Sequence, residues 1–580
     1  MKEISQLTAL KDHIFSDASI SVVNHNLLQN YAGEDLIIFI SLCNTKERAH
    51  VVKGKGKTLE SAWKNAERNA QLAITDKKID VIWAKADIVN SVKEIRTKDL
   101  NIEVVSNHFR NFLRKGIAFD SNFNFAFLET EVNGNKMITY YTEKQISNME
   151  VDYDSVILNL KNINHYLKFY YDNKGLTAIP DSITLFTTIG FFCDEPGFVY
   201  DLYSGELDCS RRAIHTADNK VIEKVIIDAS MYLYGLIKPD GQFTYGYFPI
   251  FDNEIEGYNI ARHTSTIWSL INLYRMTGND ELVPKLNAAI NFLLEGNVVY
   301  KNDVTAYVVE RAAGEIKLGG NGVAVIMLTE YMDVFETDKY VDMVKHLANG
   351  ILQLQNQYTG EYYHVLNFPD YSPKDEFRVV YYDGEATFAL TRAYTFTREQ
   401  IYLDGAAAAV KNFIEKNYTK HRDHWVAYAL NEITKYIPDP RYYEFALRNV
   451  KVNLSSIYRR TTTYHTYLEL LMTGWQTYKR LIDSGIVIEY LEGFDVKYFA
   501  ETIYKRAFHM LNGYFYPEVA MYMKSPNKVV NSFFVRHHNF RVRIDDVQHF
   551  IGGYYFYTLY FDDIRPYLSD DFIRSINSGL

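Results

Sequence analysis

The chain has 580 residues, of which 47% are hydrophobic and 15% aromatic, so it can bury a large core. Its formal net charge is −10 and it has no long basic run, which argues against a nucleic acid or an anionic membrane surface as partner. No segment approaches the about 18 consecutive apolar residues of a membrane-spanning helix, so no membrane insertion is expected. The N-terminus lacks an apolar signal segment, and Cys43, Cys193 and Cys209 lie too far apart for a metal or disulfide framework. These features together predict a reduced, cytoplasmic protein.

Residues 1–150 are predicted to form a small α/β domain. The apolar run 35–43 predicts a strand, and 53–74 predicts a turn followed by a helix with Thr58 as its N-cap. The turn contains GKGKT but lacks the spacing of a phosphate-binding loop. Residues 151–218 give mixed signals and are predicted to be a strand-rich connector. The α/β domain is a candidate surface for a protein partner.

Residues 219–580 are predicted to be helical and repetitive. Thr277, Thr337 and Thr397 lie sixty residues apart, each in a polar turn between two helical segments. The helix before each turn is apolar on most sides, which is typical of a buried helix, and the helix after it is amphipathic. The inner segments begin near Asn259, Gly319, Asp383, Asp423, Thr463 and Asp545, and the outer segments near Asn219, Asp280, Asp338, Arg398, Pro440 and Asp495.

This alternation resembles the (α/α)6 toroid of six-hairpin glycosidases, N-acylglucosamine 2-epimerases, glucuronyl C5-epimerases and lanthionine cyclases. Loose similarity to these families lies in ARHTSTIWSLINLYRMTGN, YYDGEATFALTRAY and RTTTYHTYLELL. The resemblance covers about residues 219–565. It implies a mainly α protein in which a toroid follows the α/β domain and connector, with a ligand cleft where the chain enters the inner helices.

Ionisable residues at these predicted entrances are the candidate site. A general acid and base would come from Asp383, Glu385, Asp546 and His549. Substrate contacts are expected from Arg262, His263, Asp423, His424, Trp425, His465, Glu469 and Arg543. No metal and no cofactor is predicted, because the histidines and cysteines lack the spacing of a zinc site.

Helix geometry and capping limit these assignments. Asp383 and Glu385 point about 200° apart on a regular helix, so both are not expected to face the cleft. Aspartates at helix starts are also good N-caps, and Asp545 with Gln548 has the pattern of a capping box. Asp545 is therefore expected to cap the last inner helix, while Asp546 or His549 faces the cleft. The glycines at 552 and 553 predict close packing against a neighbouring helix.

The sequence thus favours an enzyme that acts on a sugar or oligosaccharide by general acid/base chemistry, with acidic and phosphorylated sugars among the candidates. A glycoside hydrolase would use two carboxylates, whereas the resemblance implies a histidine pair for a sugar epimerase. The alternative is a non-catalytic glycan- or peptide-binding protein that serves assembly in surface-polysaccharide biosynthesis.

Overall fold

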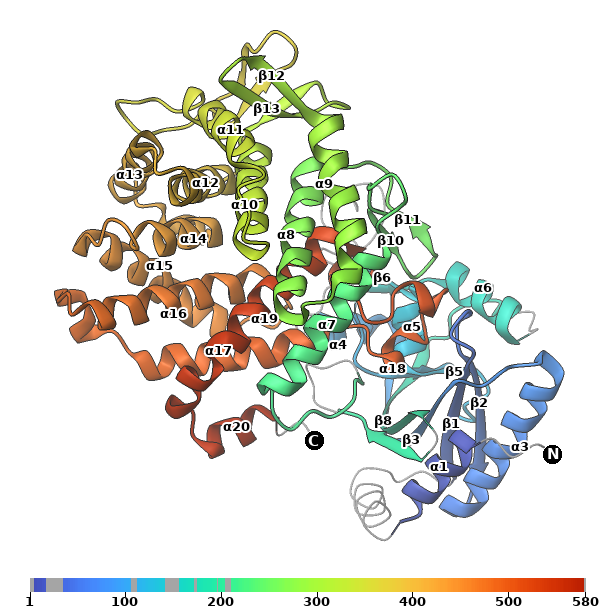
Figure 1. Ribbon diagram of the computed structural model, residues 1–580. Coiled ribbons are helices and arrows are strands. Elements are labelled where there is room, and N and C mark those ends of the chain that lie inside the picture. Colours follow the sequence, from blue (N-terminus) through green and yellow to red (C-terminus); the bar gives the residue numbers. More distant parts are fainter. Residues whose placement is uncertain are drawn as a thin grey trace.

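The computed structural model describes residues 5–16, 35–105, 112–140, 156–171, 175–195, 197–203 and 210–577. An antiparallel sheet near the N-terminus lies beside a ring of helices that forms the larger part of the molecule (Figure 1). Among the described residues, no helix is both long and apolar enough to cross a bilayer.

The sheet has seven strands in the order β2-β1-β3-β8-β4-β5, with β9 paired to β8. Its strands are β1 (Leu36–Cys43), β2 (His50–Gly56), β3 (Trp83–Arg96), β4 (Gly116–Ala118), β5 (Ala126–Phe127), β8 (Ser182–Glu195) and β9 (Phe198–Asp201). The other elements of this part are α1 (Ser5–Ile14), α3 (Leu59–Lys77), α4 (Leu100–Val105), α5 (Glu129–Gly134), α6 (Leu160–Tyr171) and the pair β6 (Ile138–Tyr140) and β7 (Val156–Leu158).

Strand β1 is apolar on both faces because both faces are covered. Ile38 and Ile40 pack in a cluster with α1 and α3, whereas Ile37 and Phe39 belong to the core that continues into the helical ring. The helix predicted after 53–58 is α3, and Thr58 caps it by accepting a hydrogen bond from the backbone N–H of Ser61. The turn predicted at residues 53–57 is wrong, because Lys53–Gly56 belong to strand β2 and pair with β1, and only Lys57 and Thr58 separate this strand from the helix.

Strands β8 and β9 come from the segment predicted to be a connector. β8 pairs along β3 and lies near the middle of the sheet, so residues 182–201 add strands to the same sheet as residues 36–96. The domain boundaries at residues 150 and 218 stay predictions.

Six inner helices form a closed ring. They are α8 (Ile260–Thr277), α10 (Leu318–Val334), α12 (Tyr381–Thr397), α14 (His424–Ile433), α16 (Thr466–Ser484) and α19 (Ile544–Ile564). Each packs against the next in chain order, and α19 packs against α8 to close the circle (Figure 1). Residues on nearly every side of these helices are buried, as their sequences predict.

Six outer helices surround this ring. They are α7 (Asn219–Gly235), α9 (Val283–Asn297), α11 (Val341–Gln353), α13 (Gln400–Glu415), α15 (Pro440–Tyr458) and α17 (Val496–Met510). Each contacts inner helices on one side and carries exposed charged residues on the other. The protein is therefore mainly α, an (α/α)6 toroid preceded by a strand-rich α/β region, as predicted.

The threonines at sixty-residue spacing stabilise equivalent turns. The Oγ1 atoms of Thr277, Thr337 and Thr397 each accept a hydrogen bond from the backbone N–H two residues later. This side-chain turn competes with helix continuation and favours a helix end at these points.

Short strands line the rim where the inner helices begin. β10 (Gly246–Phe248) pairs with β11 (Asn253–Glu254) and with β17 (Val542–Arg543). The β10–β17 pair joins the segment before the first inner helix to the segment before the last inner helix. A second sheet holds β12 (Val298–Asn302), β13 (Thr305–Glu310), β14 (Glu315–Lys317), β15 (Val365–Asn367) and β16 (Pro373–Asp375). The C-terminal part also contains α18 (Pro517–Ala520) and α20 (Asp570–Asn577).

The N-terminal sheet contacts the toroid through the segment around α18. The backbone N–H of Ala49 donates to the carbonyl of Met521 at 2.7 Å, and the hydroxyls of Ser41 and Tyr522 lie 2.8 Å apart. A fully buried ion pair between Lys85 and Asp87 lies beside the Tyr522 ring. These buried polar contacts fix how the sheet sits on the ring.

Close packing of α16 and α19 gives a stability prediction. A Cβ added at Gly553 would lie 2.9 Å from the Cβ of Leu468, so Gly553→Ala should lower the free energy of unfolding by about 1–3 kcal/mol. Gly296→Ala in α9 is the control, because a Cβ there meets open space and alanine favours a helix by up to about 1 kcal/mol. Urea denaturation measures both; equal effects would contradict the close contact.

Candidate active site

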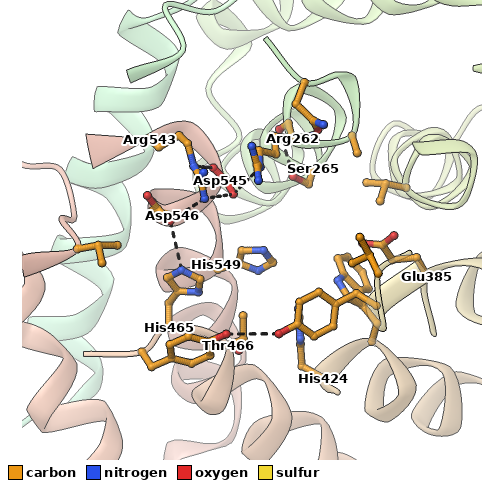
Figure 2. Close-up of a pocket in the computed structure, with 18 of the residues that line it drawn as sticks. Arg262, Ser265, Glu385, His424, His465, Thr466, Arg543, Asp545, Asp546 and His549 are labelled. Atoms are coloured by element: carbon orange, nitrogen blue, oxygen red, sulfur yellow. Dashed lines mark hydrogen bonds and ion pairs between the residues drawn. The ribbon is translucent and has the colours of Figure 1, made fainter. Parts of the chain in front are cut away.

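A cavity of about 350 Å³ opens among the first turns of the inner helices (Figure 2). All six inner helices or the residues just before them contribute to its lining, together with the segment 535–543. The volume lies within the range of small-molecule sites. The inner helices therefore bring residues from distant parts of the chain to one place, as the toroid predicts.

Most of the predicted site residues line this cavity. They are Arg262, Glu385, His424, Trp425, His465, Arg543, Asp546 and His549, together with Asp545. Four others do not line it: His263, Asp383, Asp423 and Glu469. The contacts of each group separate those that face the cavity from those that support it.

His549 forms a dyad with a buried carboxylate. Its Nδ1 donates a hydrogen bond to Glu469 Oε2 at 2.8 Å, and Glu469 also accepts from the Tyr428 hydroxyl at 3.1 Å. Burial alone would lower the pKa of His549, but the charge and hydrogen bond of Glu469 raise it above its ordinary value. Glu469 thus orients the imidazole and leaves Nε2 as the free ring nitrogen.

Three histidine rings lie in a row, with His549 in the middle. The His465 ring stacks on His549 at 5.1 Å between centroids, and the His424 ring meets it edge-on at 5.2 Å. His424 is 1% exposed and neither of its ring nitrogens has a hydrogen-bond partner among the described residues. Burial, reinforced by the two neighbouring histidines, lowers the pKa of His424 well below its ordinary value. His424 is therefore neutral while its neighbour His549 holds a proton more readily.

Glu385 is a carboxyl group without a cation. It lines the cavity on α12, and its Oε2 is buried without a hydrogen-bond partner among the described residues. Burial, together with the charge of Asp423, raises the pKa of Glu385 well above its ordinary value. The raised pKa favours the neutral acid, which has a hydroxyl proton to donate.

Asp545 and Asp546 bind arginines instead of capping α19. Asp545 pairs with Arg262 and Arg543, and Asp546 accepts two hydrogen bonds of 3.0 Å from Arg541. The N-cap of α19 is Arg543, and no side chain caps the helix there, so the capping role predicted for Asp545 is wrong. An ion pair with a guanidinium binds the carboxylate more strongly than a backbone N–H does.

Asp383 and Asp423 support the inner helices from behind the cavity. Asp383 lies in the first turn of α12, where it accepts hydrogen bonds from Tyr418 at 2.7 Å and from His364 at 2.9 Å. Asp423 caps α14 by accepting from the Trp425 backbone N–H at 2.8 Å, as predicted. The N-cap role predicted for Asp383 is wrong, since Val380 holds that position.

His263 faces outward, toward the outer helix α9. Its ring contacts the Tyr258 hydroxyl at 2.7 Å and the Ala289 carbonyl at 3.0 Å, and burial lowers its pKa to about 4. The adjacent Arg262 turns the other way and lines the cavity. Neighbouring residues on a helix point about 100° apart, and on α8 this rotation turns His263 to the outer helix while Arg262 faces the cavity.

Tyrosines that the sequence did not single out also line the cavity. Tyr381, Tyr382 and Tyr464 are all in its wall, and the Tyr381 and Tyr464 hydroxyls lie 3.3 Å apart. Trp425 also lines the cavity, and its ring packs on the ring of Trp268. The tyrosines directly precede predicted entrance residues, which is the signal that could have revealed them.

The dyad and its neighbour could also hold a metal ion. One ligand atom from each of His424, Glu469 and His549 lies within 4.8 Å of the other two. Two imidazoles and a carboxylate are ligands that zinc accepts. The Nδ1 contact of 2.8 Å between His549 and Glu469 is nonetheless a complete hydrogen bond without an ion.

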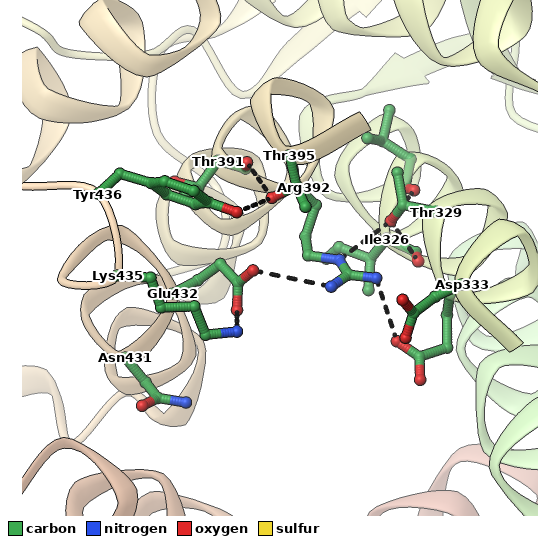
Figure 3. Close-up of polar contacts among 12 residues, drawn as sticks. Ile326, Thr329, Asp333, Thr391, Arg392, Thr395, Asn431, Glu432, Lys435 and Tyr436 are labelled. Atoms are coloured by element: carbon green, nitrogen blue, oxygen red, sulfur yellow. Dashed lines mark hydrogen bonds and ion pairs between the residues drawn. The ribbon is translucent and has the colours of Figure 1, made fainter. Parts of the chain in front are cut away.

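A second polar cluster surrounds Arg392, near the C-terminal ends of α10, α12 and α14 (Figure 3). Arg392 donates from Nε to Thr329 at 3.3 Å and from Nη2 to Glu330 at 3.4 Å, and its Nη1 lies 3.7 Å from Glu432. Burial lowers the pKa of Arg392, but these carboxylates raise it above its ordinary value overall. Arg275 pairs with Glu330 from the adjacent helix. Charged side chains therefore cluster at the end of the inner helices that lies away from the cavity.

The fold and cavity define a six-hairpin toroid with a histidine- and carboxyl-lined site. No protein-family model and no curated protein matches the sequence. Similar solved structures include D-mannose isomerase, at 12% identity over 60% of this chain and 99% of that chain, with a TM-score of 0.44. Cellobiose 2-epimerase from Bacillus thermoamylovorans has 13% identity over 50% and 86%, with a TM-score of 0.41. A family 76 glycoside hydrolase from a bovine Bacteroides thetaiotaomicron strain has 8% identity over 69% and 97%, with a TM-score of 0.31. Identities this low do not indicate which residues act.

The buried pair of Asp546 and Arg541 gives a second prediction. Asp546→Asn removes the carboxylate partner, itself buried, of a partly buried guanidinium and should lower the free energy of unfolding by about 3 kcal/mol. Burial would raise the pKa of Asp546, but His465 and the arginines lower it below its usual 3.8. The contribution of the ionised Asp546 carboxylate to the stability of the fold is therefore present above about pH 4 and is lost as the pH falls through the lowered pKa.

The measurement is urea denaturation at several pH values. The difference between wild type and Asp546→Asn should be constant between about pH 5 and 7 and should shrink below about pH 4. Asp571→Asn is the control, since its pair with Arg574 is exposed and worth at most about 1 kcal/mol. A variant as stable as wild type at pH 7 would show that the pair contributes nothing net.

Proposed function

We propose that the protein is a carbohydrate-active enzyme that moves a proton at a carbon next to a carbonyl group, as sugar isomerases and epimerases do. The observation that carries this proposal is the His549–Glu469 dyad in the mouth of the toroid, opposite an unpaired, neutral Glu385. The resemblance of the sequence to toroid families that act on sugars supports the substrate class.

In this proposal His549 is the general base. Glu469 holds Nδ1–H, so Nε2 is the atom that takes a proton from the substrate carbon. The carboxylate also stabilises the imidazolium that forms, which makes His549 a stronger base than an isolated histidine. The burial of Glu469 keeps this interaction strong, because little water screens it.

Glu385 supplies the acid. When the base removes the proton, negative charge develops on the carbonyl oxygen, and a neutral carboxylic acid can donate a hydrogen bond to it. Retaining a carboxyl group as a neutral donor by apolar burial is an established way to stabilise an enolate. Glu385 and His549 line the same cavity from different inner helices, α12 and α19 (Figure 2).

The spacing of the histidines favours transfer on one face of the sugar. Two bases on opposite faces of one carbon each need about 3–3.5 Å to it, which places their nitrogens about 6–7 Å apart. The rings of His424 and His549 meet edge-on with centroids 5.2 Å apart, a direct contact that leaves no room for a carbon between the two rings. A single base that moves a proton between adjacent carbons fits this geometry, and aldose–ketose isomerisation is the reaction of that kind.

Hydrolysis fits the site less well. It requires a second carboxylate that is free to act as base or nucleophile. Among the described lining residues, Asp545 and Asp546 are both bound to arginines and Glu385 is held neutral. Neither aspartate is in the state that such a mechanism needs.

The aromatic wall suits a sugar. Tyr381, Tyr382 and Tyr464 offer ring surfaces and hydroxyls, and the apolar faces of pyranose rings pack on such surfaces. The cavity volume of about 350 Å³ is sufficient for a monosaccharide.

Proton exchange with solvent tests this function. A panel of sugars is incubated with the protein in D2O, and deuterium incorporation next to the carbonyl is followed by NMR. The wild type should catalyse exchange, and His549→Asn should reduce it by about 10²–10⁴-fold, the usual contribution of a general base. His346→Asn on the outer helix α11 is the matched control and should have no effect.

The same samples distinguish the other functions. Cleavage of a glycoside without deuterium incorporation would identify a hydrolase, and sugar binding with neither reaction would identify a binding protein. Because the proposed chemistry uses no metal at His424, Glu469 and His549, protein dialysed against a chelator should retain its exchange activity. Loss of activity that zinc restores would contradict the base role of His549.

The pH dependence of kcat/KM gives a further prediction. Activity should rise as His549 loses its proton, with an apparent pKa above 6.5 because Glu469 raises it, and should fall at higher pH as Glu385 ionises. Glu469→Gln removes the raising charge, so the acidic limb should move to lower pH. Glu385→Gln should remove the alkaline limb. An acidic limb that stays in place in Glu469→Gln would show that another group is the base.

A further inference from the structure

One wall of the cavity is basic although the chain as a whole is acidic. Between Glu518 and Asp545 the sequence has no carboxylate side chain, whereas it contains Lys524, Lys528, Arg536, Arg541 and Arg543. The part of this segment that lines the cavity includes Arg541, Arg543 and two histidines, His537 and His538. The pairing of β17 with β10 holds this wall in place.

The cations at the mouth are not fully neutralised. Three guanidinium groups, those of Arg262, Arg541 and Arg543, lie with two carboxylates, those of Asp545 and Asp546. One positive charge is therefore left over at a partly buried site, where water screens it weakly.

Arg262 is the guanidinium with a free edge. Its Nε lies 2.9 Å from Asp545 and its Nη1 donates to the Tyr245 hydroxyl at 2.6 Å, while Nη2 makes no hydrogen bond with any described residue. Its side chain is 38% exposed, against 17% for Arg541 and for Arg543. Figure 2 shows Arg262 and Arg543 on either side of Asp545, on the same side of the cavity. The free edge is therefore available to a ligand.

We propose that the site takes an anionic sugar, whose carboxylate or phosphate binds Arg262 beside the basic wall. That the ligand is a sugar rests on the function proposed above; that it is an anion rests on the arginines. A guanidinium binds planar or tetrahedral oxyanions through parallel N–H donors, which a neutral hydroxyl cannot match. The anion would fix the remainder of the sugar relative to His549 and Glu385.

Binding measurements on the intact protein test the charge of the ligand. Isothermal titration compares D-glucuronate, D-glucose 6-phosphate, D-glucose and inorganic phosphate at low and high salt. We expect at least one anionic sugar to bind ten times or more tighter than glucose, with a preference that weakens as salt rises. Tighter binding of D-glucuronate would indicate a sugar acid as ligand, and tighter binding of D-glucose 6-phosphate would indicate a sugar phosphate.

Variants then assign the preference to Arg262. Arg262→Gln should remove most of the tenfold difference between anionic sugars and glucose, and Arg262→Lys should keep part of it because the charge remains. Arg275→Gln, at the other end of the barrel, is the matched control and should bind as wild type does. The comparison of sugars on wild-type protein needs no variant, so a folding defect in a variant does not prevent the test.

Two results would overturn the inference. Either no anionic probe, inorganic phosphate included, binds more tightly than glucose, or Arg262→Gln weakens every sugar equally. His549→Asn separates this inference from the proposed reaction, because it should abolish exchange and leave the anion preference intact. Anion preference without exchange in the wild type would contradict the reaction alone, and exchange of neutral sugars without preference would contradict the anionic ligand alone.

Discussion

The contact between α16 and α19 holds His549 and Glu469 in place. The glycines at 552 and 553 let the two helices approach closely: a Cβ at 552 would lie 2.7 Å from Glu469 Oε1, and one at 553 would lie against Leu468. That approach brings Glu469 on α16 within 2.8 Å of His549 on α19. Glycine in a helix costs about 1 kcal/mol, so packing across the last joint of the ring must offset two such costs. The geometry of the dyad is therefore set by backbone distance and not by side-chain flexibility.

A second constraint comes from charge. Burying Asp546 and Glu469 is costly unless each has partners, and the structure provides an arginine for the first and a histidine and a tyrosine for the second. Glu385 is the exception among the described residues, because no cation pairs with it and burial raises its pKa instead. The pKa values of Asp546 and Glu385, which line the same cavity, are thus shifted in opposite directions.

The sequence predicted the architecture better than the site. Periodicity and the apolar or amphipathic character of each segment identified all twelve ring helices, because burial of an inner helix affects every one of its residues. The aspartates were less predictable. A capping motif at Asp545 could not reveal that Arg262, almost three hundred residues earlier, would bind that carboxylate. His263 and Arg262 were both expected in the cleft, but their helix faces, which depend on exact rotation in the ring, separate them. Tyr381 and Tyr464 were missed because tyrosines are abundant in this chain.

The strand pairing of β10 with β17 has a consequence for how the chain acquires its shape. Tyr247 pairs with Val542, so the contact that joins the first hairpin to the last spans about half of the polypeptide. Such a contact forms late, since the entropy of closing a long loop must be overcome first. During synthesis, the first five hairpins would emerge from the ribosome as an open arc with one apolar edge exposed. The cavity would exist only once α19 had been made, and the nascent protein would be prone to association until this helix closed the ring.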